Sequence, residues 1–255
     1  MKRDHLHLKD DVPTLIAIGV LVSLVASLAH EVLGHGLGCR IDGGHITLVT
    51  FLVFRCAGAG ALADGGGPVG VIVAGSLALA IAALIKRRPS LLRLFLFNLG
   101  AISLLWACGQ AIEEAFDGSD DWGHVAADLG WTHAWHLMVG AVAVLGYAAI
   151  VRVSGRLSAI IAGGRAIRLW LPHGAATVSA VVLGALWHGG RTGSALDGFL
   201  SFGVAPIGYL LVARRAAQGN AVDDLVGRNL AFVVFVAAAW IAFALTVAGG
   251  IGRLS

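Results

Sequence analysis

His30, Glu31 and His35 lie within a stretch of six residues that follows the uncharged, apolar run 14–29. Neutral imidazole nitrogens are common zinc ligands, and a carboxylate beside them can serve as the general base of a hydrolase. An ionisable side chain at membrane depth costs roughly 2.5–3.5 kcal/mol on insertion and is a functional-site hypothesis by default. These residue types therefore predict a zinc site in which His30 and His35 bind the metal and Glu31 is the base.

The spacing of the two histidines places a geometric condition on this site. In a regular helix, side chains four residues apart are separated by about 40° around the axis, and side chains five apart by about 140°. His30 and His35 are at the wider spacing, so they can bind one ion only if the helix is overwound or bulged. A π-bulge adds one residue and restores the alignment. We therefore predict a helix distortion near Gly34.

Two other interpretations of this stretch remain open. A regular helix would place Glu31, His35 and Cys39 on one face, with Glu31 as a metal ligand instead of a base. The polar groups could also be satisfied by neighbouring helices without metal. Two histidines that flank a glutamate are hard to explain by packing alone, and this favours the two-histidine site.

The composition indicates an integral membrane protein. Apolar residues make up 58% of the 255 residues, charged residues 13%, and the mean hydropathy is +0.85, whereas a soluble domain has about 25% charged residues. The net charge of +3 is explained by basic loops and does not indicate a nucleic-acid partner. The three cysteines do not predict a disulfide framework, and a Cys39–Cys56 pairing is left open.

The chain is predicted to be one transmembrane domain, 1–255, of the all-α class, with about six or seven spans in a polytopic helix bundle. A polar N-terminal tail, 1–11, precedes the first span and contains His5 and His7. The expected spans are 14–38, 68–85, 91–111, 131–151, 169–187, 196–212 and 230–251.

The segment 37–67, directly after the first span, is not simply helical. Asp42 begins a turn signal, 46–54 is rich in β-branched and aromatic residues, and 57–67 is rich in glycine. The run 46–54 is too short to span a membrane as a helix. We expect a short hairpin or re-entrant segment here, and an ordinary loop outside the membrane is the alternative.

The distribution of basic residues predicts the orientation of the chain. With the N-terminus in the cytoplasm, most of the 18 Lys and Arg residues lie on the inner side, as the positive-inside rule requires. The end of the first span and the acidic loop 117–124 then both lie on the outer side. The predicted localisation is a multi-pass membrane protein with a cytoplasmic N-terminus.

The segment His30-Glu31…His35 resembles the motif of site-2-protease-like (M50) intramembrane zinc metalloproteases, whose motif is His-Glu-x-x-His. Here it is expanded by one residue. In that family a distant Asp is the third zinc ligand, and Asp121 is the corresponding choice, with Asp120 and His124 as rivals. A weaker similarity is the Gly-Pro pair at 67–68, which opens the second expected span.

The resemblance implies an endopeptidase that cleaves transmembrane segments of partner proteins within the lipid bilayer. His30, His35 and Asp121 would hold Zn²⁺, which lowers the pKa of a bound water towards about 7. Glu31 would accept the proton of this water and return it to the leaving amine. The alternative is a non-proteolytic relative that acts as a scaffold, a chaperone or a metal carrier.

Overall fold

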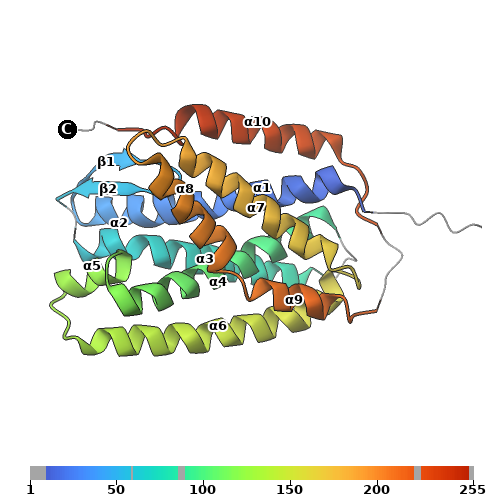
Figure 1. Cartoon of the computed structure of the whole chain (residues 1–255), viewed down its shortest axis with the longest axis horizontal. Helices are drawn as coiled ribbons and strands as arrows, with labels where there is room; N and C mark the ends of the chain where they lie inside the picture. The colour runs from blue at the N-terminus through green and yellow to red at the C-terminus, as the bar shows by residue number, and fades with distance from the viewer. Residues whose placement is uncertain (1–9, 59, 86–89, 221–224, 253–255) are drawn as a thin grey trace, which may run out of the picture.

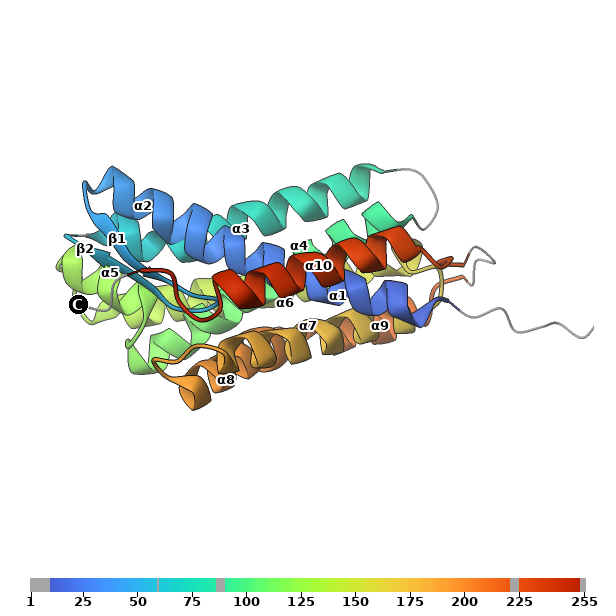
Figure 2. The same ribbon diagram turned by 90° about the horizontal axis from the view of Figure 1, so that it is seen from above.

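The computed structural model describes residues 10–58, 60–85, 90–220 and 225–252, which form a helical bundle with one β-hairpin (Figures 1 and 2). The first half of the chain contains α1 (Val12–Ser27), the π-helix η1 (Leu28–His35), α2 (Gly36–Ile41), β1 (His45–Val49), β2 (Phe54–Ala57), α3 (Ala61–Leu84), α4 (Leu91–Asp117) and α5 (Asp121–Asp128). The second half contains α6 (Ala134–Ile161), α7 (Ile167–Ala185), α8 (Arg191–Phe199), the π-helix η2 (Leu200–Val204), α9 (Tyr209–Ala216) and α10 (Leu230–Thr246).

Among the described residues, five helices are long and apolar enough to cross a membrane, and the apolar helix α10 is shorter. The five are Val12–Ile41, Ala61–Leu84, Leu91–Asp117, Ala134–Ile161 and Arg191–Ala216. The predicted all-α bundle and the membrane class are thus confirmed, and a count of six or seven spans stays a prediction.

Helix α4 forms the centre of the bundle, and it lies between α3 and α6 (Figure 1). Its side chains Leu94, Phe97, Ile102 and Leu105 are fully buried. Helix α6 is the least buried of the five long helices, and its outward surface is apolar, as expected for a helix that faces lipid. The central position of α4 matters for the site because its C-terminal end carries polar residues into the interior.

Helix α1 begins where the sequence predicts. The Asp11 side chain caps it by accepting a hydrogen bond of 3.0 Å from the Thr14 amide. Asp10 is buried and accepts a 2.7 Å bond from Arg168 of α7. The last two residues of the expected polar tail are therefore anchored to the bundle, while His5 and His7 lie outside the described residues.

The predicted hairpin is confirmed by the antiparallel strands β1 and β2, which pair from His45 opposite Ala57 to Val49 opposite Phe54. The C-terminal segment continues the sheet on the other edge of β1. There Val49 and Ile251 exchange two backbone hydrogen bonds of 2.9 Å. Whether the hairpin re-enters the membrane is not shown by its backbone and stays a prediction.

Helix α3 begins at Ala61, seven residues before the expected start of the second span at Pro68. The cause lies in the turn after α2, where the Asp42 carboxylate accepts 2.9 Å hydrogen bonds from the Gly60 and Ala63 amides. This contact caps the N-terminus of α3 and extends the helix through the glycine-rich segment. The expected span at 196–212 is likewise not one regular helix, because η2 interrupts it.

A disulfide joins Cys39 of α2 to Cys56 of β2. The bond ties the end of the first long helix to the hairpin, across a sequence separation of 17 residues. The sequence left this pairing open because an odd number of cysteines does not identify partners. Cys108 is the remaining cysteine and is free.

Candidate metal centre

The helix distortion predicted from the histidine spacing is confirmed by η1, which contains both His30 and His35. In a π-helix each amide bonds to the carbonyl five residues earlier, so residues at i and i+5 share a face. The Gly36 amide bonds in this way to the Glu31 carbonyl. As a result, the Nε2 atoms of His30 and His35 lie 3.1 Å apart.

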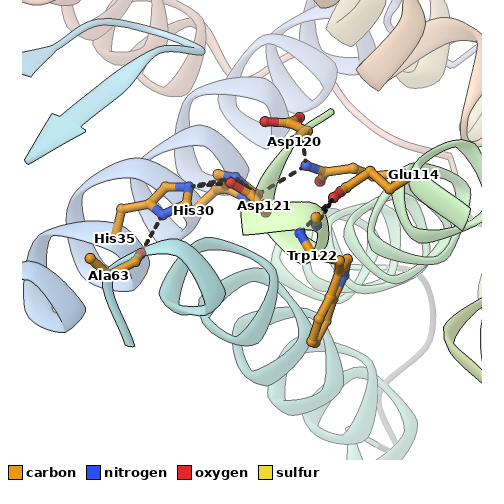
Figure 3. A network of polar contacts seen from close by, with 9 residues as sticks. His30, His35, Ala63, Glu114, Asp120, Asp121 and Trp122 are labelled. Atoms are coloured by element: carbon orange, nitrogen blue, oxygen red, sulfur yellow. Dashed lines mark hydrogen bonds and ion pairs between the residues drawn. The ribbon is translucent and has the colours of Figure 1, made fainter. Parts of the chain in front are cut away.

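Asp121 completes a group of three side chains, and each of the three is buried (Figure 3). Its two carboxylate oxygens lie 3.2 Å from His30 Nε2 and 3.4 Å from His35 Nε2. Two ligands bound at about 2.0–2.1 Å to a tetrahedral zinc ion are separated by about 3.3–3.4 Å. The three observed separations fit this geometry, so the residues that the sequence singled out could hold one zinc ion.

The hydrogen bond of His35 fixes which of its nitrogens faces the centre. Its Nδ1 lies 2.7 Å from the Ala63 carbonyl oxygen, which can only accept, so Nδ1 carries the proton. The lone pair of Nε2 is then free for a metal ion, an arrangement that is usual for ligating histidines. His30 stacks on Trp106, with ring centroids 4.9 Å apart, and this contact orients its ring.

Gly67 of α3 leaves the space in front of both imidazoles open. A Cβ atom at this position would lie 2.6 Å from His30 Nε2 and would overlap His35 Nε2. The two helices approach closely because their contact is made by backbone: side chains at Gly34 or Gly66 would each collide with the opposite main chain. This glycine contact between η1 and α3 resembles small-residue packing in other membrane helices.

Asp121 is held by two residues of α4. Gln110 Nε2 donates a 3.0 Å hydrogen bond to Asp121 Oδ2. Glu114 Oε2 accepts bonds of 2.5 Å and 3.3 Å from the Trp122 and Gly123 amides, which fixes the first turn of α5. Both contacts are orienting interactions of the kind that usually surround a metal ligand.

The charge of Asp121 suits a cation. Burial raises its pKa, but the hydrogen bond from His30 and the charges of His30 and His35 lower it more, so that the net pKa lies below the ordinary value. A carboxylate with a lowered pKa stays ionised at neutral pH and is ready to bind a positive ion.

The rival residues lie outside the group formed by His30, His35 and Asp121. Asp120 is the N-cap residue of α5 and His124 lies one turn later, and both side chains are exposed. The alternative ligand set with Cys39 is wrong, because the sulfur of Cys39 is in the disulfide. Glu31, the predicted general base, has a side chain that is buried, with an exposed fraction of 3%.

A cavity of about 820 Å³ lies in front of these groups. It is lined by the residues of the candidate centre, by the hairpin, and by α8 and η2. The lining includes His30, Glu31, His35, Asp121, the residues 52–57, Asp197, Leu200, Ser201 and Ala205. The cavity gives the centre and Glu31 a common space in which a ligand could be placed.

The sequence did not predict the parts played by Gln110, Glu114 and Gly67. Glu114 follows a long apolar run, a position typical of a helix end in water, but it is 2% exposed and supports α5. The sequence does contain a pattern that could have indicated a shared role for the α4 residues. Trp106, Gln110 and Glu114 recur at every fourth position, which places them on one helix face.

Comparisons with protein-family models, with curated proteins and with solved structures find no match for this chain. The functional argument therefore rests on the residues of the site and their geometry.

Proposed function

We propose that this protein is a zinc-dependent intramembrane endopeptidase, similar to site-2 proteases, that cleaves transmembrane segments of partner proteins. The observation that carries the proposal is the convergence of His30, His35 and Asp121, with separations of 3.1–3.4 Å between their ligand atoms. A π-helix at the point where the spacing requires one is difficult to explain by packing alone, because π-helices are rare and frequent at functional sites.

In this proposal each residue of the centre has a separate part. His30 Nε2, His35 Nε2 and the Asp121 carboxylate hold the zinc ion. Zinc, when bound, lowers the pKa of water and polarises a carbonyl group. The Ala63 carbonyl holds His35 in the tautomer that leaves Nε2 unprotonated, and Gln110 holds the Asp121 carboxylate.

Glu31 is the proposed general base and acid. It follows His30 directly, is buried and lines the cavity. Its carboxylate takes a proton from the attacking water and then delivers this proton to the nitrogen of the departing amine. The proton thus starts on water, resides on Glu31 during the attack and ends on the amine product.

The hairpin offers a place for an extended substrate. The outer edge of β1 is occupied at Val49 by Ile251, whereas within the described residues no strand pairs with the outer edge of β2. Residues 52–57, which include β2, line the cavity. A locally unwound segment of a partner protein could add to β2 as a strand, which would bring its backbone carbonyl groups towards the centre.

The disulfide supports the predicted orientation. Disulfides persist in oxidising compartments and are rare in the cytosol. The Cys39–Cys56 bond lies at the end of the first long helix, which the charge distribution assigns to the outer side. Both arguments support a centre at the outer side of the membrane and an N-terminus in the cytoplasm.

The decisive experiment measures zinc content and cleavage in the same purified samples. We expect one zinc ion per chain in the native protein and in Glu31→Gln, and cleavage of a transmembrane test substrate only by the native protein. Glu113→Gln is a matched control, because Glu113 lines the same cavity with an exposed carboxylate, and it should retain both zinc and cleavage.

Three results would count against parts of this proposal. The absence of stoichiometric zinc in the native protein would refute the proposed enzymatic function. Loss of zinc in Glu31→Gln would make Glu31 a ligand instead of a base. Stoichiometric zinc without cleavage of any transmembrane test substrate would favour the non-proteolytic alternative, a scaffold or metal carrier.

A further inference from the structure

Each imidazole of the candidate centre has an aromatic ring against one of its faces. Trp106 of α4 stacks on His30, with ring centroids 4.9 Å apart and an angle of 26° between the ring planes. Phe54 of β2 stacks on His35, with centroids 5.3 Å apart and an angle of 14° between the planes. Both distances lie in the range of favourable stacked aromatic pairs. The two contacts therefore restrain the planes of both candidate ligands.

The two aromatic rings are held in different ways. Trp106 is 3% exposed and packs on Phe202, so the core of the bundle fixes its position. Phe54 is half-buried, lines the cavity and belongs to a two-stranded hairpin. A hairpin of this kind is marginally stable without further contacts. The stack on His35 therefore depends on how β2 is attached to the rest of the fold.

The attachment is the disulfide between Cys56 and Cys39. Phe54 and Cys56 are two residues apart in a strand, so their side chains point to the same face and their Cα atoms are about 6.6–6.8 Å apart. His35 and Cys39 are four residues apart in a helix, so they share a face and are separated by about 6 Å along its axis. The strand thus lies against the helix with matched spacing. The disulfide forms one contact, and the stack of Phe54 on His35 forms the next.

The hydrogen bond between His35 and Ala63 does not by itself fix the imidazole plane. It sets the tautomer and the position of Nδ1, but a single bond leaves the ring free to tilt. The torsion that turns the plane has a broad energy profile in histidine. A flat ring against one face resists this rotation, which would move Nε2 away from the other two ligands. The stack with Phe54 supplies the restraint that the hydrogen bond lacks.

We propose that Phe54 is a positioning residue for His35, and that the disulfide between Cys39 and Cys56 acts on the centre through Phe54. The phenyl ring holds the imidazole plane at the angle that directs Nε2 towards the other two ligands. The disulfide holds the phenyl ring in that position. This inference deepens the proposed function and rests on its zinc centre, but it does not depend on proteolysis.

The first test measures zinc affinity of the purified full-length protein by competition with a chelator. Phe54→Leu keeps an apolar side chain but removes the flat ring, and we expect a loss of affinity of about 2- to 10-fold, the size of one aromatic contact. Phe54→Tyr keeps the ring and should retain native affinity. Val53→Ala is the matched control, because Val53 precedes Phe54 in the hairpin and lines the same cavity, and it should also bind zinc as the native protein does.

A double-mutant cycle tests the part of the disulfide. Replacing Cys39 and Cys56 together with Ser should lower zinc affinity in the native background. The same replacement should cause no further loss in the Phe54→Leu background, because both changes remove one shared restraint. Losses of zinc affinity that simply add would overturn the proposed action of the disulfide through Phe54.

A measurement on the metal-free protein separates this inference from the proposed function. Diethyl pyrocarbonate acylates accessible imidazole nitrogens, and peptide mass spectrometry locates the modified residue. His35 should react faster in Phe54→Leu than in the native protein or in Val53→Ala. Faster reaction in a protein that binds no zinc would refute the zinc centre and leave the positioning role of Phe54 standing. In a protein that binds zinc, equal affinities of Phe54→Leu and Val53→Ala overturn the inference alone, and without zinc equal reaction rates overturn it.

Discussion

Replacing Gly67 with Ala should remove zinc from the centre without changing any ligand. The new methyl group would lie 2.6 Å from His30 Nε2 and would overlap His35 Nε2, whereas carbon and nitrogen atoms in contact need about 3.5 Å. Each imidazole would have to move by about 1 Å, and zinc sites tolerate deviations of about 0.2 Å in ligand distance. The methyl group therefore competes directly with the metal for the same space.

The magnitude follows from the ligands that are displaced. Disturbing a residue that only orients a ligand costs about 10- to 100-fold in metal affinity. Gly67→Ala displaces two ligands, so we expect a loss of at least about 100-fold, equivalent to about 2.8 kcal/mol. Extra volume in a packed interior also destabilises by about 1–3 kcal/mol, so the thermal midpoint of the metal-free protein should fall as well.

The assay is competition for zinc between the purified protein and a chelator of known affinity, followed by elemental analysis. Gly65→Ala is the control, because it adds the same methyl group to α3 but meets only Val125 Cγ2, at 3.2 Å. It should keep native zinc affinity. The reasoning is refuted if Gly67→Ala binds zinc as tightly as Gly65→Ala.

Three further predictions concern residues around the centre. Gln110→Leu should reduce zinc affinity by about 10- to 100-fold, measured by the same competition, because it removes the bond to Asp121; unchanged affinity would show that the bond is dispensable. Cys56→Ser should lower the free energy of unfolding by up to about 3 kcal/mol, because it opens a 17-residue loop, and a native-like denaturation midpoint in detergent would contradict this. Asp10→Asn should destabilise the fold by about 1.5–3 kcal/mol, because Arg168 would lose its charge-assisted hydrogen bonds of 2.7 Å and 3.1 Å to the Asp10 carboxylate; a change below about 1 kcal/mol in the same denaturation series would argue against a structural ion pair.

The features that could be predicted from sequence are those set by local chemistry. Composition identified a membrane protein, and the spacing of His30 and His35 required a distorted helix, because helical geometry relates spacing directly to direction. Asp121 was chosen because the resemblance to site-2-protease-like proteins implies a distant Asp ligand, and its place on the same predicted side as the histidines supported this choice. The structure brings these three side chains together, and their role as zinc ligands remains a proposal.

The features that could not be predicted depend on contacts between distant segments. Helix α3 begins at Ala61 because Asp42, from another turn, caps it. Glu114 is buried against α5, where the Trp122 and Gly123 amides donate hydrogen bonds to its carboxylate, whereas a position after an apolar run is typical of a helix end in water. A side chain at position 67 is excluded only because two histidines from another helix lie opposite it. Propensity and periodicity contain no information about such partners.

The pairing of Val49 with Ile251 has a consequence for the biosynthesis of the protein. The ligands of the centre lie in the first half of the chain, but the residue that bridges to the outer edge of β1 is Ile251. A two-stranded hairpin is marginally stable alone, and chains fold progressively from the N-terminus as they are made. The outer edge of β1 is therefore closed at Val49 only after residue 251 has been synthesised.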